Sequence, residues 1–141
     1  MAEALPKEIR LDIVTPERLV AHDSVSAVMI PGKNGYLGVL PGHAPLLTEL
    51  MSGLVVYQRD GVFHHLAVTW GFAEVLPDRV IILVRTAERS EEIDVERAER
   101  ARQRAEERLK RVSDPTVDFE RARAALARAL ARLEAARHGR G

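Results

Sequence analysis

Apolar and polar residues alternate along the first 88 residues of the chain, with a repeat of about two. In the stretch IRLDIV, the apolar Ile9, Leu11 and Ile13 are separated by Arg10 and Asp12. Successive side chains of a strand point to opposite faces, so this pattern is typical of a half-buried β-strand. The stretches VSAVMI, LVVYQ, VFHHLAV, GFAEVL and RVIILV complete a series of short predicted strands.

Turn-forming residues separate these predicted strands. The tripeptide Arg59-Asp60-Gly61 lies between LVVYQ and VFHHLAV, where the glycine tolerates the positive φ of a tight hairpin. Pro77-Asp78 separates GFAEVL from RVIILV in the same way. Because no helical period lies among these strands, the sequence predicts an antiparallel β-sandwich or barrel.

From residue 93 the repeat changes to that of an α-helix. Apolar residues recur at intervals of three, four and seven, which places them on one side of a helix. This first stripe consists of Val95, Ala98, Ala105, Leu109 and Val112. The segment SDPTVD then interrupts the helix, because a proline disfavours helical geometry in the residue before it.

A second helical stretch follows, and we expect the carboxylate of Asp118 to cap it by accepting backbone N–H bonds. Its apolar stripe consists of Phe119, Ala122, Ala125, Leu126, Ala129, Leu130 and Leu133. The short connection makes the two helices antiparallel neighbours. Alanines bury little area, at ~0.8 kcal/mol per methylene group, so we hypothesise a marginal hairpin that can exchange packing partners.

The composition narrows the possible classes of protein. The chain has 141 residues and no cysteine, so it fits one or two small cores without disulfides or zinc–thiolate sites. No apolar run approaches the roughly 18 residues of a membrane span. The first segment, MAEALPKEIR, lacks the apolar centre of a secretion signal. We therefore expect any membrane association to come through partner proteins.

The net charge of zero conceals an asymmetry between the two parts of the chain. Residues 1–96 carry 8 Lys/Arg and 14 Asp/Glu, a net charge of −6, whereas residues 97–141 carry 13 and 7, a net charge of +6. The basic part is either an ordinary solvated helical face or a surface that docks on acidic protein or phosphate.

Catalysis finds no support in the sequence. His64 and His65 are adjacent in a predicted strand, so they point to opposite faces and cannot both bind one metal ion without a bulge. His43 lies in the loop PGHAP, where a single histidine is more often a structural hydrogen-bonding group than a catalyst. No serine, threonine or carboxylate pair has a recognisable catalytic context, and the glycine-rich stretch lacks the Gly-Lys-Ser/Thr of a phosphate loop.

Nucleic acid is the obvious alternative partner for the basic helices. Glutamates interrupt the arginines, however, and Phe119 is the only aromatic residue after position 72. Because single-strand binding needs aromatic stacking platforms, we expect no nucleic-acid partner.

Four segments, in order, resemble the epsilon subunit of bacterial F-type ATP synthases: IPGKNGYLGVLPGHAPLLTEL, GFAEV, VIILVRTAE and IDVERAERARQRAEERL. The likeness covers nearly the whole chain. It implies an N-terminal sandwich of about ten strands over residues 1–88 and a C-terminal helical hairpin over residues 89–141. It also implies a non-catalytic protein that is peripheral to the cytoplasmic side of the bacterial inner membrane, in a complex that couples hydrogen-ion transport to ATP synthesis.

In that family the sandwich contacts the gamma subunit and the ring of c subunits, and the extended hairpin reaches the catalytic alpha/beta head and inhibits ATP hydrolysis. The resemblance therefore makes Tyr36 a candidate contact to the c ring and His43 a candidate contact to gamma. The family's beta subunit presents an acidic loop, for which the candidate contacts here are Arg121, Arg123, Arg128, Arg132 and Arg137.

Several members of the family also bind ATP when the hairpin is compact, as a regulatory ligand and not as a catalytic cofactor. The residues that match the family's site are Glu88, Ile93, Asp94, Arg97, Ala98, Arg104, Arg128 and Arg132. Arginine forks suit phosphate, and apolar side chains can flank the base. An alternative is a free-standing nucleotide-sensing adaptor with the same architecture.

Overall fold

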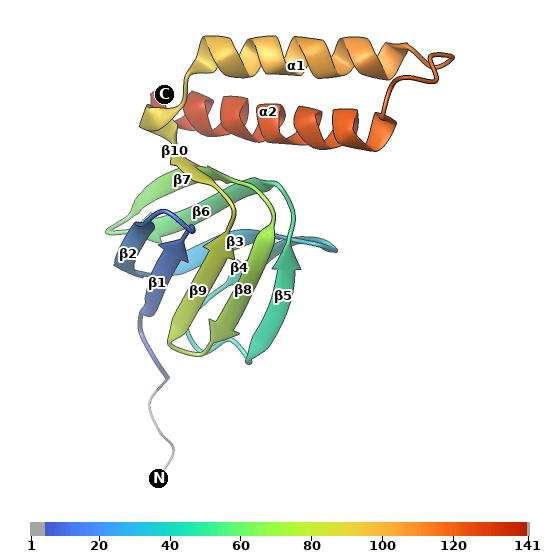
Figure 1. Ribbon diagram of the computed structural model, residues 1–141. Helices are drawn as coiled ribbons and strands as arrows, with labels where there is room; N and C mark the ends of the chain where they lie inside the picture. Colours follow the sequence, from blue (N-terminus) through green and yellow to red (C-terminus); the bar gives the residue numbers. More distant parts are fainter. Residues whose placement is uncertain (1–4, 141) are drawn as a thin grey trace.

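The computed structural model describes residues 5–140 of the chain. The expectation about a secretion signal rests in part on Met1–Ala4, which lie outside the described residues, as does Gly141. Among the described residues, neither helix has an apolar stretch long enough to span a bilayer. The described chain forms a β-rich body with a hairpin of two helices lying across one end of it (Figure 1).

Ten strands, one 3₁₀ turn and two helices follow each other in residues 5–140. The strands are β1 (Ile9–Val14), β2 (Leu19–Val25), β3 (Ala27–Gly32), β4 (Gly35–Val39), β5 (Leu46–Leu50), β6 (Gly53–Arg59), β7 (Val62–Val68), β8 (Gly71–Leu76), β9 (Arg79–Val84) and β10 (Ala87–Arg89). They are followed by η1 (Ser90–Glu92), α1 (Val95–Lys110) and α2 (Phe119–Arg140). The expected sandwich of about ten strands and the two-helix hairpin are therefore confirmed.

The strands are hydrogen-bonded in the order β10-β7-β6-β3-β5-β8-β9-β1-β2, and β4 pairs with β3. The pairs are antiparallel except for β1 and β9, which run parallel, with Leu11 opposite Val80. The purely antiparallel expectation was wrong at this one pair. Periodicity within a strand reports which face is buried, but it carries no information about the direction of a partner far away in the sequence.

Local sequence signals produce the predicted turns and alternations. Ile9, Leu11 and Ile13 are fully buried in the sandwich core, as their alternation predicted. Asp60 and Gly61 have φ values of 51° and 75° and connect β6 to β7. A two-residue hairpin loop with positive φ at both positions matches the right-handed twist of its strands.

An aspartate side chain caps the N-terminus of each helix. Asp94 Oδ1 accepts a hydrogen bond from the backbone N–H of Arg97 at 3.1 Å, and Asp118 Oδ1 accepts one from that of Arg121 at 3.1 Å. Each satisfies a backbone donor that the first turn of a helix leaves free. The predicted cap of the second helix is thus confirmed.

Alanines fill the contact between the two helices, where Ala98 and Ala105 of α1 and Ala122 and Ala129 of α2 are buried. The predicted stripes were wrong at two positions. Val112 is 79% exposed, because α1 ends at Lys110.

Leu130 of α2 is 47% exposed, although its neighbours Ala129 and Ala131 are both buried. Helix α2 therefore buries alanines on two faces, one toward α1 and one toward the sandwich, and Leu130 lies between them.

A second, smaller core joins α2 to the sandwich. It consists of Leu54, Ala67, Ile93, Ala131, Ala135 and Ala136. The strands and turn that α2 contacts are β6, β7, β10 and η1, whereas the loop end of the hairpin projects past the sandwich (Figure 1). The docked hairpin thus rests on a small apolar area made largely of alanine methyl groups.

The β8–β9 pair has no room for a side chain at Gly71. A Cβ built there would lie 1.9 Å from the carbonyl oxygen of Leu83, which is backbone and cannot turn away. We expect Gly71→Ala to lower the free energy of unfolding by about 3 kcal/mol, since overpacked sites cost about that much. Urea denaturation measures the change. The control is Gly38→Ala, whose Cβ would meet no atom within 4 Å; an equal loss in both variants would contradict this account.

Candidate functional site

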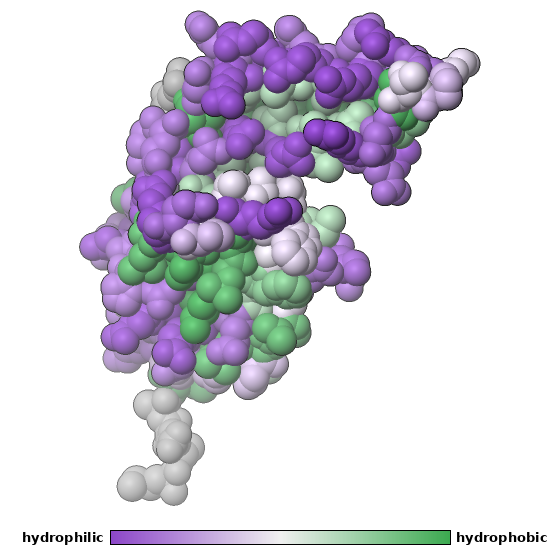
Figure 2. All heavy atoms as spheres, viewed as in Figure 1, coloured by the Kyte–Doolittle hydropathy of each residue, from purple (hydrophilic) through white to green (hydrophobic). Residues whose placement is uncertain are grey.

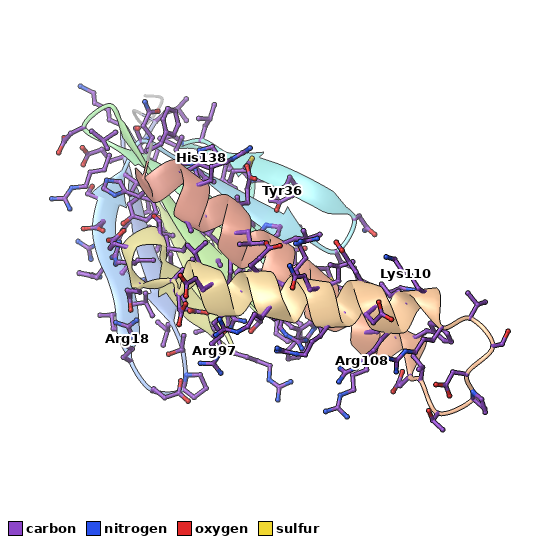
Figure 3. All side chains as sticks on the ribbon, turned by 90° about the horizontal axis from the view of Figure 1, so that it is seen from above. Arg18, Tyr36, Arg97, Arg108, Lys110 and His138 are labelled. Carbon is purple, nitrogen blue, oxygen red and sulfur yellow. The ribbon has the colours of Figure 1, made fainter. Side chains whose placement is uncertain are left out.

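A cavity of about 320 Å³ lies where the sandwich, η1 and both helices meet. The residues that line it are Glu88, Glu92, Asp94, Arg97, Ala98, Ala101, Arg104 and Arg132. They come from β10, η1, α1 and α2, so the cavity is complete only when the hairpin is folded against the sandwich. Figure 3 shows Arg97 at the sandwich end of the hairpin, together with Arg18, whereas Arg108 and Lys110 lie at its far end.

Regular secondary structure positions each of these groups. Glu88 is held by the pairing of β10 with β7, opposite Ala67. Arg97, Ala101 and Arg104 follow each other at intervals of four and three along α1, so they share one helix face. Arg132 reaches the cavity from α2.

One ion pair crosses the cavity between the sandwich and the hairpin. Arg132 Nε donates to Glu88 Oε1 at 2.6 Å, and both side chains are about one-third exposed. A pair with this much solvent contact contributes ~1 kcal/mol or less, so it supports the docked hairpin only modestly.

The other charges in the cavity are distributed unevenly. Glu92 is paired with Arg18 from the β1–β2 connection, at 2.9 Å. Asp94 is engaged in capping α1. In the described part of the chain, neither Arg97 nor Arg104 has a carboxylate within salt-bridge distance. Two guanidinium groups therefore remain available to an anionic ligand.

Another arginine of α1 is excluded from this role by its neighbours. Arg102 makes ion pairs with both Glu99 and Glu106 on the same helix. The hydrogen bond from Arg102 holds the pKa of Glu99 below its ordinary value, so this small network stays ionised near neutral pH. It belongs to the solvated face of α1.

Six of the eight residues predicted to bind ATP line the cavity, namely Glu88, Asp94, Arg97, Ala98, Arg104 and Arg132. The other two lie elsewhere. Ile93 is 3% exposed and belongs to the second core, where it packs with Ala131 and Ala135. Arg128 is half-buried on α2, one turn before Arg132, and is not among the lining residues.

The sequence reasoning missed two lining residues, Glu92 and Ala101. The position of Ala101 could have been found, because its spacing from Arg97 and Arg104 places it on the same face of a helix. No local signal identifies Glu92, whose position depends on its contact with the distant Arg18.

The residues predicted to contact partners lie on the surface of the sandwich and of α2. Tyr36 on β4 is 56% exposed, and its hydroxyl accepts a hydrogen bond from the N–H of Leu54 at 3.1 Å. His43 lies in the loop after β4, with Nδ1 2.7 Å from the carbonyl oxygen of Ala44. Their contacts with other subunits stay predictions.

On α2, Arg121 and Arg123 are exposed. Arg121 lines a shallow polar cavity of about 350 Å³ at the hairpin loop, together with Arg108 and Arg111. Arg137 instead donates to Glu134 of the same helix at 2.5 Å, so it is partly neutralised.

The sandwich exposes apolar side chains that the sequence reasoning did not single out. Leu47, Phe72 and Leu83 on β5, β8 and β9 are 71%, 43% and 53% exposed. Figure 2 shows apolar surface gathered on this body, whereas the hairpin above it is mainly hydrophilic. A large exposed apolar area is typical of a protein–protein contact.

Trp70, which precedes β8, fixes part of this surface. Its ring packs edge-to-face on Phe72 at 5.1 Å between centroids, and its Nε1 donates to Glu49 at 2.7 Å. That hydrogen bond, together with one from Lys33, holds the pKa of Glu49 below its ordinary value.

Two family models match the chain along its length. The description "ATP synthase, Delta/Epsilon chain, beta-sandwich domain" matches residues 8–90, and "ATP synthase, Delta/Epsilon chain, long alpha-helix domain" matches residues 91–137. The chain belongs to the ATP synthase delta/epsilon family.

Relatives in this family include the ATP synthase epsilon chain of Moorella thermoacetica, which is 55% identical over 129 residues, or 91% of this chain and 96% of the relative. The epsilon chain of Koribacter versatilis is 60% identical over 98 residues, which cover 70% of this chain and 69% of the relative. The recognition of an epsilon chain from sequence motifs is thereby confirmed.

A chain in the mitochondrial ATP synthase of Euglena gracilis, in a structure described as OSCP/F1/c-ring, has a similar fold. Its TM-score is 0.82 at 27% identity, and the match covers 96% of this chain and 85% of that chain.

Proposed function

We propose that this epsilon-family chain is a non-catalytic central-stalk subunit of a bacterial F-type, proton-translocating ATP synthase. Its sandwich links gamma to the c ring, and its hairpin regulates ATP hydrolysis at the alpha/beta head. The similarity to bacterial epsilon chains and to a chain within an F1/c-ring assembly supports this role. In such a complex the chain would be peripheral to the cytoplasmic side of the plasma membrane.

The exposed apolar surface of the sandwich supports the stalk contacts. Phe72, Leu83 and Leu47 offer a non-polar area that a partner subunit can cover. We propose Tyr36 for the c-ring contact and His43 for the gamma contact. Tyr36 carries an exposed ring whose hydroxyl is held by β6, so it can stack on a partner without losing its own hydrogen bond.

The regulatory part of the proposal rests on one observation: two unpaired arginines, Arg97 and Arg104, face a cavity that both the sandwich and the hairpin line. Guanidinium groups bind phosphate through paired hydrogen bonds. We propose ATP as the ligand, with its phosphates near these arginines. The carboxylate of Glu88 or of Asp94 accepts from the adenine amino group.

Arg132 belongs to α2 and lines the cavity, so a ligand that binds it also binds the hairpin. The guanidinium group of Arg132 is paired with Glu88 across the junction. A phosphate of ATP can replace the carboxylate as its partner, which frees Glu88 for the base. Ala98 supplies an apolar contact to the base, whereas Ile93 belongs to the second core and does not line the cavity. Arg128, one turn before Arg132 on α2, lies outside the lining of the cavity.

Binding of ATP would stabilise the compact hairpin by mass action. A ligand that binds only the compact form, present at 100 times its dissociation constant, favours that form by ~2.7 kcal/mol. This gain is large compared with an exposed ion pair of ~1 kcal/mol or less. Nucleotide can therefore decide whether the hairpin stays docked.

The released hairpin is the proposed inhibitor. Its candidate contacts to an acidic surface of the catalytic head are Arg121, Arg123, Arg128, Arg132 and Arg137. Exposed pairs contribute ~0–1 kcal/mol each, so several must act together. We accordingly propose residues 1–88 as the anchoring domain and residues 89–141 as the regulatory domain.

Arg104→Ala should weaken ATP binding by the isolated chain about tenfold or more, because a hydrogen bond between charged groups contributes about 1.5–3 kcal/mol. Isothermal titration calorimetry measures the dissociation constant. The matched control is Arg123→Ala, which removes an exposed arginine of α2 outside the cavity and should leave the affinity unchanged. Equal affinities in all three proteins, or no binding by the wild type, would refute the site.

A chain truncated after Asp94 should raise the ATPase rate of the assembled synthase, because it keeps every strand but lacks both helices. We expect an increase of about fivefold or more at low ATP, since ~1 kcal/mol of lost inhibitory contact corresponds to about that factor. A steady-state ATPase assay of complexes with equal subunit content makes the comparison. An unchanged rate would reject inhibition by the hairpin.

A further inference from the structure

Two histidines stack on each other across the junction between the sandwich and α2. His65 comes from β7 and His138 from α2, with ring centroids 4.1 Å apart and an interplanar angle of 4°. His138 lies six residues beyond Arg132, about 9 Å farther along the helix axis. The stack is therefore a contact of the docked hairpin that is separate from the nucleotide cavity.

A neutral pair of imidazoles can stack in this way, but two imidazolium ions repel each other at such a distance. The negative charge that can offset this repulsion is the carboxylate of Glu134, whose Oε1 lies 3.0 Å from Nε2 of His138. The same oxygen accepts a hydrogen bond from Arg137 at 2.5 Å, which lowers the pKa of Glu134, so Arg137 and His138 share one carboxylate oxygen.

Within the described part of the chain, the other elements packed around His65 offer no further carboxylate contact. Val56 of β6 lies opposite it in the sheet, and Ser90 of η1 donates its hydroxyl to the backbone carbonyl of His65 at 3.3 Å. On β7 itself, His64 points away and stacks on Tyr57.

Burial lowers the pKa of His65, and the charges of His138 and His64 lower it further, against an opposite effect of Glu134. A released hairpin removes the burial and the charge of His138. The docked form therefore binds a proton at His65 less readily than the released form. The contribution of neutral His65 to the stability of the docked form is therefore fully present above the ordinary histidine pKa of about 6.5. It is lost as the pH falls below that value.

We propose that His65 and His138 form an acid-sensitive latch, in which protonation of both rings drives α2 off the sandwich. The surrounding contacts are weak enough for the latch to matter, because the second core contains mainly alanines and the Glu88–Arg132 pair is partly exposed. The latch rests on the proposed release of the hairpin, but it does not require nucleotide binding. In this scheme ATP holds the hairpin on the sandwich and prevents inhibition. A low pH would release the hairpin and so inhibit ATP hydrolysis.

The full-length chain suits a fluorescence test because it contains no cysteine. Cysteines placed at Val62 and Val112, which are 55% and 79% exposed, carry a donor and an acceptor dye at the β6–β7 turn and at the hairpin loop. Energy transfer is measured from pH 8.0 to pH 5.0, first without nucleotide and then with ATP. The equilibrium constant for docking should fall severalfold, on the order of fivefold, between pH 7.5 and 5.5, because the released form binds protons more readily than the docked form.

His138→Phe keeps an aromatic ring and the burial of His65 but removes the second titratable ring, so it should weaken this pH dependence without abolishing it. The matched control is His22→Phe, which alters an exposed histidine of β2 that is paired with Asp12 and should keep the wild-type dependence. A flat wild-type profile, or an unchanged slope in His138→Phe, overturns the latch.

An NMR titration of the wild-type histidine rings tests the latch without any substitution. The pKa of His65 should lie below the ordinary histidine value of about 6.5; titration of this ring at or above that value also overturns the latch. The ATP series separates the two proposals. A response to ATP without a response to pH refutes the latch alone, and the reverse refutes nucleotide binding alone.

Discussion

Alanine contacts on two faces of α2 determine how firmly the hairpin is held. One face, with Ala122 and Ala129, packs against α1, and the other, with Ala131, Ala135 and Ala136, packs against the sandwich. Small side chains allow the backbones to approach closely, but each methyl group contributes only about 0.8 kcal/mol. The sandwich has a separate core of larger residues, such as Leu11, Ile82 and Tyr57. The chain therefore combines a firmly packed anchor with a weakly docked pair of helices.

Charged groups acquire their importance from this weak docking. The Glu88–Arg132 pair, the unpaired Arg97 and Arg104, and the histidine stack all lie at or beside the junction. In a protein held by a large apolar interface, changes of about 1–3 kcal/mol would have little effect on the population of the docked form. At this junction the apolar core is small and made largely of alanines, so we infer that a bound anion or an added proton can shift the equilibrium. The opposite net charges of the two parts of the chain fit a hairpin with alternative docking partners.

Much of the fold could be predicted from the sequence because its determinants are local. Alternation in IRLDIV predicted a strand with three buried positions, and Asp118 after Pro115 predicted the start of α2. The parallel pairing of β1 with β9 could not be predicted, since it joins segments about 70 residues apart. The exposure of Leu130 depends on α2 having two packed faces, and periodicity alone does not reveal how many faces a helix buries.

The candidate site was predictable where a motif fixes spacing along α1, as for Arg97, Ala98 and Arg104. It was not predictable where a distant contact decides the position, as for Glu92 with Arg18. The His65–His138 stack also depends on a distant contact. Adjacent strand residues point to opposite faces, which excludes a shared metal site for His64 and His65, but this alternation does not indicate which element covers either ring.

Native-state hydrogen exchange of the full-length chain tests the weak docking most directly. Amides of α1 and α2 should exchange through openings that leave the sandwich intact, with opening free energies at least ~2 kcal/mol below those of buried amides in β1, β8 and β9. A common opening free energy for helices and sandwich, with a single global unfolding step, would contradict the account.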